Sequence, residues 1–121
     1  MRVLVFGSRN WTDYQAVLKG LRAELAKGPI ELVIDGQAPG ADTCGHEAAV
    51  ELGLPFQRFP ANWSKYGRAA GPIRNQQMLD EGKPTLALGF HEDIANSKGS
   101  ADMLRRLKRY GIKTRINGVL A

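Results

Sequence analysis

The sequence has little of what several protein classes require. Its single cysteine, Cys44, excludes an intrachain disulfide and is typical of a reducing compartment. No apolar run approaches the roughly 20 residues that cross a bilayer. Met1–Phe6 is too short for a signal peptide and has no small-residue cleavage site. We therefore expect a cytoplasmic protein without membrane contact.

Histidine is also scarce, and the two residues, His46 and His91, lie far apart. No Cys/His spacing is typical of zinc, so we expect no metal site and no cofactor. His46 is predicted on a helix surface. His91 is predicted in a solvated loop, with a general base as the alternative. No Ser-His-Asp arrangement is recognisable, so the sequence identifies no catalytic residue and leaves open whether the protein is an enzyme.

Size and charge indicate an ordinary domain with anionic partners. The 121 residues are 43% hydrophobic and 24% charged, which predicts one domain with a single core over residues 1–121. Lys and Arg number 17 against 12 Asp and Glu, a net charge of +5. Such an excess attracts nucleic acid and nucleotides alike. The charge is spread along the chain and does not name the partner.

Apolar strand-like runs alternate with stretches of helical periodicity along the whole chain. This alternation predicts an α/β fold with a doubly wound, mainly parallel five-stranded sheet and helices on both faces. Residues 60–72 are interpreted as a long loop, and residues 117–121 as a tail. Asp13 and Ser100 are predicted to cap helices. Strands are expected at residues 3–6, 31–35, 56–59, 85–88 and 113–116.

Right-handed crossovers place the loops after the first four strands at one carboxyl edge of the sheet. Gly36–Asp42 joins a strand to a helix, an order in which a helix N-terminus can hold an anion. Gly36 and Gly40 would let a ligand approach the backbone. A tight turn without a ligand explains the same residues equally well.

The other three loops contain polar and cationic residues. Ser8 could donate to a phosphate and Arg9 could clamp one, and pairing of Arg9 with Asp35 or Asp42 explains this loop equally well. Gly99 and Ser100 open a helix that could receive an anion, or they form an ordinary cap. In the third loop and the helix start that follows it, we predict core packing for Trp63, and ligand contact for Arg68, Arg74 and Asn75.

Four blocks of the chain, together with Met78, resemble the YspA-type, cpYpsA-related branch of the SLOG superfamily: Gly7–Trp11, Gly36–Asp42, Pro60–Trp63 and Tyr66–Asn75. That superfamily also contains the LOG phosphoribohydrolases and the DprA/Smf DNA-processing proteins. The resemblance implies a Rossmann-like sheet that binds a nucleotide or nucleotide derivative at its carboxyl edge. The implied ligand-binding residues are Gly7, Ser8, Arg9, Gly36, Gly40, Ala41, Asp42, Arg68, Arg74, Asn75, Gly99 and Ser100.

The chain departs from the LOG enzymes at the residue that would carry catalysis. LOG enzymes have a Pro-Gly-Gly-x-Gly-Thr-x-x-Glu block, whose Glu is catalytic, and Met103 takes the place of that Glu here. Asp102 is one residue early and would point about 100° away around a helix. Glycosidic cleavage of the LOG type would therefore need Asp102 or Asp42 to take over.

The sequence thus predicts a module that senses or sequesters a nucleotide. The alternatives are an N-glycosidic hydrolase using Asp42 or Asp102, and a single-stranded DNA-binding protein, which makes nucleic acid the less expected partner. Related proteins often form dimers, so the resemblance allows a homodimer, but the apolar helix faces do not identify its contact surface. For Arg74→Ala we expect loss of the ligand response with a nearly unchanged melting temperature of the free protein. Neither the ligand nor the pathway is identified by the sequence.

Overall fold

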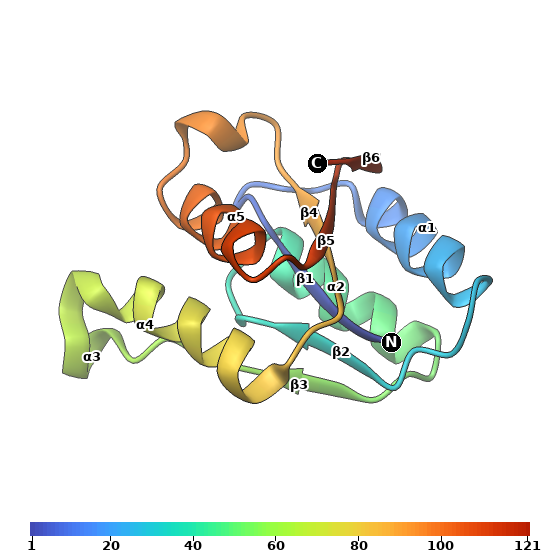
Figure 1. Cartoon of the computed structure of the whole chain (residues 1–121), viewed down its shortest axis with the longest axis horizontal. Helices are drawn as coiled ribbons and strands as arrows, with labels where there is room; N and C mark the ends of the chain where they lie inside the picture. The colour runs from blue at the N-terminus through green and yellow to red at the C-terminus, as the bar shows by residue number, and fades with distance from the viewer.

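Strand β1 (Arg2–Gly7) lies at the centre of the sheet in the computed structural model, which describes residues 1–121. Its four residues 3–6 are all buried, as a parallel strand covered on both faces requires. Leu4 lies opposite Ile34 on one neighbour and Ala87 on the other. The strand order is β3-β2-β1-β4-β5-β6 (Figure 1), with β2 (Leu32–Asp35), β3 (Phe56–Arg58), β4 (Leu86–Phe90), β5 (Lys113–Ile116) and β6 (Val119–Leu120).

Helices cover both faces of the sheet, because successive residues of β1 point to opposite sides. On one face, α1 (Tyr14–Leu25) and α2 (Ala41–Glu51) pack with Val3 and Val5 in a core cluster of 14 buried residues. On the other, Leu4 and Phe6 join a cluster of nine with residues of the π-helix η2 (Met78–Gly82) and α5 (Gly99–Arg109). Helix α4 (Ala70–Gln77) packs beside α5 (Figure 1). None of the helices has the length and hydrophobicity that a bilayer crossing requires.

The expected number of five strands is wrong, because the predicted tail at residues 117–121 forms a sixth strand. Ile116 pairs with Val119 across a two-residue turn, and β6 runs antiparallel to β5. The turn residues Asn117 and Gly118 both have positive φ, 50° and 84°. Asn-Gly is the dipeptide that favours this kind of hairpin turn, so the signal was present in the sequence.

The long loop predicted at residues 60–72 is also wrong. It contains α3 (Trp63–Tyr66) and the 3₁₀ turn η1 (Gly67–Ala69), and α4 begins at Ala70. Asn62 caps α3, since its side chain accepts the Lys65 N–H at 3.1 Å. Such a short helix leaves no apolar periodicity to detect.

Of the two predicted helix caps, one is confirmed. Asp13 accepts the N–H of Ala16 at 3.1 Å at the start of α1. At the start of α5, Ser97 rather than Ser100 accepts the Ala101 N–H, at 3.0 Å. Ser100 lies within the first turn of α5 and is buried.

The sheet changes winding direction between β1 and β4. The segment after β1 leads to α1 on one face, and the segment after β4 leads through the 3₁₀ turn η3 (Ile94–Asn96) to α5 on the other. The two segments diverge, so they leave a crevice beyond the carboxyl ends of these strands, where open α/β sheets bind ligands.

Candidate functional site

A cleft of about 940 Å³ opens at this crevice. Its walls come from the loop after β1, from α3 and α4, and from the segment that starts α5. Phe6, Met78 and Met103 give it an apolar lining, each with less than 5% of its surface exposed. The structure brings nine of the twelve predicted site residues to the cleft: Gly7, Ser8, Arg9, Asp42, Arg68, Arg74, Asn75, Gly99 and Ser100.

The other three predicted site residues, Gly36, Gly40 and Ala41, do not line the cleft. Ala41, the first residue of α2, is fully buried in the core, and its N–H donates to the Ser8 carbonyl at 2.9 Å. A Cβ on Gly36 would lie 2.6 Å from Nη1 of Arg74, so this glycine makes room for a side chain. Gly40 lets α2 begin against the loop after β1. These three residues therefore position the elements that form the cleft and do not contact its interior.

Four cations line the cleft without forming a salt bridge. Arg9, Arg68, Arg74 and Lys98 take part in none of the six ion pairs of the molecule. Neither acidic partner predicted for Arg9 pairs with it, because Asp35 pairs with Arg58 at 2.9 Å and Asp42 accepts the Gly36 N–H at 2.8 Å. The charges of Arg9, Arg68 and Lys98 therefore have no acidic partner, and the charge of Arg74 is balanced in part by the neighbouring Asp42.

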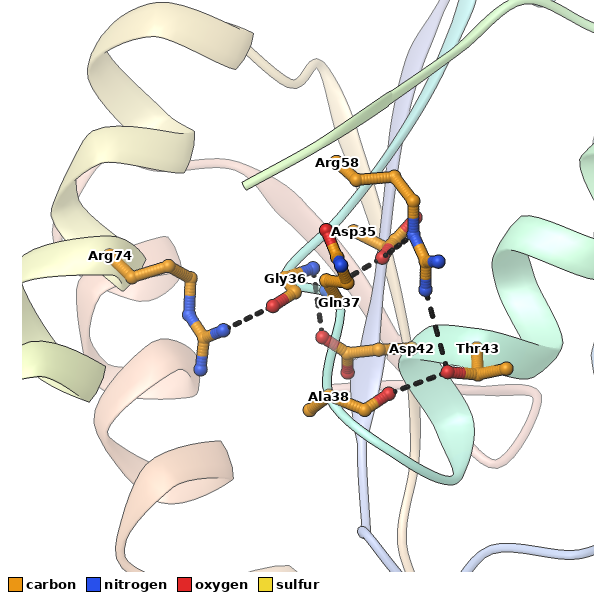
Figure 2. Close-up of polar contacts among 8 residues, drawn as sticks. All are labelled: Asp35, Gly36, Gln37, Ala38, Asp42, Thr43, Arg58 and Arg74. Carbon is orange, nitrogen blue, oxygen red and sulfur yellow. Dashed lines mark hydrogen bonds and ion pairs between the residues drawn. The ribbon is translucent and has the colours of Figure 1, made fainter. Parts of the chain in front are cut away.

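Arg74 and Asp42 meet at the peptide of Gly36 (Figure 2). Nη1 of Arg74 donates to the Gly36 carbonyl, and Asp42 Oδ2 accepts the Gly36 N–H at 2.8 Å. Burial lowers the pKa of the Arg74 guanidinium. Burial also raises the pKa of Asp42 to about 6, even though Arg74 favours its charged form. The cleft thus has a carboxyl group that titrates close to neutral pH beside a half-buried guanidinium.

This pKa predicts a pH-dependent stability that Asp42→Asn should remove. Asp42 releases its proton near pH 3.8 when unfolded and near pH 6 when folded, so the folded state binds more protons between these values. Its contribution is complete below about pH 4 and falls by about 3 kcal/mol as the pH rises past 6. Urea unfolding of the wild type and of Asp42→Asn across this pH range measures the contribution as the difference between their free energies of unfolding. Parallel pH profiles for the two proteins would contradict the assignment.

Asn75 joins the two helices that flank the cleft. Its Nδ2 donates to Asp102 Oδ2 at 3.0 Å and to the Gly99 carbonyl at 3.3 Å, and its Oδ1 accepts from Arg74 Nε. Asp102 also accepts from Arg106 Nε at 2.8 Å. Burial opposes ionisation of Asp102, but the hydrogen bonds from Arg106 and Asn75 outweigh it and lower its pKa. Asp102 is therefore a charged structural acceptor.

Two further sets of hydrogen-bond donors lie at the cleft, the Ser8 hydroxyl and the N–H groups that start α5. Ser8 Oγ donates to Glu92 Oε1 at 2.8 Å, and this hydrogen bond lowers the pKa of the exposed Glu92. A carboxylate oxygen thus already accepts from the hydroxyl that was predicted to bind phosphate. The N–H groups of Gly99 and Ser100 have no acceptor in the protein, since they are the first two of α5.

Trp63 is the residue that the sequence interpretation misplaced. It was predicted to pack in the core, but it is 50% exposed and lines the cleft. Its position beside many cations in the sequence was the available signal. His91 also lines the cleft, with Nδ1 accepting the Asp93 N–H at 2.8 Å, and His46 lies elsewhere, edge-on to Phe56. No group of three His, Cys, Asp or Glu side chains could hold a metal ion.

Comparisons with known proteins agree with this fold. The family model of the YspA, cpYpsA-related SLOG family matches residues 1–66. The chain is 33% identical to Gene 61 protein of Mycobacterium phage D29 over 119 residues. This match covers 92% of this chain and 91% of that protein. The X-ray structure of DNA processing protein A (DprA) from Streptococcus pneumoniae has a TM-score of 0.73 at 18% identity. The match covers 95% of this chain but 49% of DprA, so the chain spans about half of that protein's length, and the likeness shows the fold alone.

Proposed function

This chain belongs to the YspA, cpYpsA-related SLOG family, and we propose that it binds a nucleotide or nucleotide-derived phosphate ligand in the cleft. The observation that carries the proposal is the set of four unpaired cations, Arg9, Arg68, Arg74 and Lys98, around one cavity of about 940 Å³. A guanidinium binds phosphate through two parallel hydrogen bonds, and one outside any salt bridge has no hydrogen bond to a carboxylate to break first.

The phosphate has two kinds of donor available in the cleft. The Arg74 guanidinium is held half-buried by the Gly36 carbonyl, so little side-chain entropy is lost when it binds. The unpaired N–H groups of Gly99 and Ser100 start α5, where the helix dipole also favours an anion. We place the phosphate between these groups.

The residues of the cleft favour holding the ligand over cleaving it. Met103, whose thioether is neither acid nor base, stands where the LOG enzymes have their catalytic Glu. Asp102 is charged and already accepts from Arg106 and Asn75. We therefore propose a ligand-sensing or ligand-sequestering module.

One observation favours the hydrolase alternative, and it concerns Asp42. This carboxyl lines the cleft, and its pKa of about 6 suits proton transfer near neutral pH. Incubation of the protein with nucleoside monophosphates, followed by chromatography for released base, decides between the two functions. If the protein releases base and Asp42→Asn abolishes that release, the hydrolase function replaces the proposed binding function.

Isothermal titration calorimetry with nucleoside mono- and diphosphates, compared with the unphosphorylated nucleosides, tests the binding proposal. Arg68→Ala should lower the affinity for the phosphorylated compounds about tenfold, because one charged hydrogen bond is lost. Its effect on nucleosides should be small. Arg109→Ala is the matched control, since Arg109 is exposed at the far end of α5. Equal weakening of both compound classes by Arg68→Ala would contradict a phosphate contact.

The salt dependence of the affinity distinguishes binding of single-stranded DNA from binding of a small ligand. A strand that engages several phosphates loses affinity steeply as salt rises, whereas a nucleotide that touches few cations loses little. The DprA-like fold is compatible with either ligand. A steep slope with oligonucleotides, together with no binding of nucleotides, would contradict the proposed function.

A further inference from the structure

Trp63 stands at the wall of the cleft with half of its surface exposed. The ring comes from α3, and the guanidinium of Arg9, from the loop after β1, lies 5.8 Å from its centroid. On the α4 side, a Cβ added to Gly71 would touch Trp63 Cη2 at 3.5 Å. The indole therefore lies next to a cation and beside a helix that presents no side chain to it at that point.

Core packing does not explain this position. The apolar lining of the cleft is already supplied by Phe6, Met78 and Met103, which are 1–4% exposed. A tryptophan used for the core would bury most of its roughly 250 Å². Instead, the short helix that carries it is held in place by Asn62, whose Oδ1 accepts from the Lys65 N–H and from Ser64 Oγ, both at 3.1 Å. The chain thus fixes an exposed aromatic face beside the cleft.

We propose that Trp63 recognises the base of the ligand by stacking, with the Arg9 guanidinium contributing from the loop after β1. This inference rests on the proposed function, because it assigns the second half of the same ligand. The four unpaired cations attract phosphate, and a flat apolar ring within the same cavity complements a purine or pyrimidine. Together they specify a ligand that has both an aromatic base and a phosphate group.

Tryptophan fluorescence provides a direct measurement, because the chain has two tryptophans. The other one, Trp11, packs near Phe90 at 5.8 Å outside this cleft. In a Trp11→Phe background, all indole emission comes from Trp63. We expect at least one of AMP, GMP, CMP and UMP to quench it saturably. Ribose 5-phosphate, which has the phosphate and no base, should compete with that nucleotide without quenching.

The variant Trp63→Leu, with affinities measured by calorimetry, separates stacking from phosphate binding. The substitution should lower the affinity for the nucleotide that quenches roughly 5- to 100-fold, as expected for the loss of one base–aromatic stack. Ribose 5-phosphate should stay within about twofold of its wild-type affinity. Trp63→Phe should recover part of the loss. The melting temperature of each variant confirms that it folds, as expected for a half-exposed side chain.

The results that would overturn the inference differ from those that would overturn the proposed function. Nucleotide binding that is unchanged in Trp63→Leu, or weakened equally with ribose 5-phosphate, overturns base stacking and leaves the phosphate site in place. Quenching by a single-stranded oligonucleotide but by no mononucleotide also overturns it. If neither the nucleotides nor ribose 5-phosphate bind, both proposals are overturned.

Discussion

Replacing Gly40 with alanine should destabilise the protein by about 4 kcal/mol or more. Gly40 has φ 78° and ψ −126°, a conformation that L side chains rarely adopt. An added Cβ would lie 2.1 Å from the Ser8 carbonyl oxygen and 2.6 Å from the backbone of Arg9. The two segments cannot move apart without loss of a hydrogen bond, because the Ala41 N–H donates to that same carbonyl at 2.9 Å. Urea unfolding followed by circular dichroism measures the loss.

Two other glycines separate the steric cost from the conformational cost. Gly53 has φ 69° but no atom within 4 Å of an added Cβ, so Gly53→Ala should cost only about 1–2 kcal/mol. Gly28 has neither a positive φ nor a close neighbour, and Gly28→Ala should change the stability by less than about 1 kcal/mol. If Gly40→Ala costs no more than Gly53→Ala, the contact with Ser8 is not what requires a glycine.

Arg74→Ala should abolish measurable nucleotide binding, with a loss of about 100-fold or more. Arg74 is the half-buried cation of the cleft, and its guanidinium is oriented by the Gly36 carbonyl and the Asn75 side chain. The variant should also lose about 1–3 kcal/mol of stability, because the Gly36 carbonyl loses its donor and Asp42 loses a favourable charge. These contacts replace the sequence-based expectation of a nearly unchanged melting temperature.

Arg74→Lys distinguishes charge from geometry in the same position. Lysine keeps the positive charge near Asp42 but cannot present two parallel donors to a phosphate. We expect it to recover part of the stability and only a minor part of the affinity. Calorimetry measures the affinity, and thermal unfolding of the free protein measures the stability. Full nucleotide affinity in Arg74→Ala would remove Arg74 from the site and leave it a structural role only.

Local patterns in the sequence were sufficient for the main architecture. Apolar runs such as residues 3–6 and 32–34, which the structure places in β1 and β2, predicted parallel strands because both faces of such strands must be apolar. Asp13 was correctly predicted as a cap, since a cap depends on residues within one turn. The hairpin at Asn117 and Gly118 depended on an equally local signal, which was interpreted as a tail instead.

What the sequence by itself determined was therefore the α/β alternation and the edge of the sheet at which the glycine-rich and cationic loops gather. Tertiary structure alone decided which of these residues face the cleft and which support it. Gly40 is needed because a second loop passes within contact distance, and Asp42 acquires its raised pKa because other segments exclude water from it. Trp63 is exposed because other side chains already fill the core. Distances between segments far apart along the chain set all three properties, and no local pattern encodes such distances.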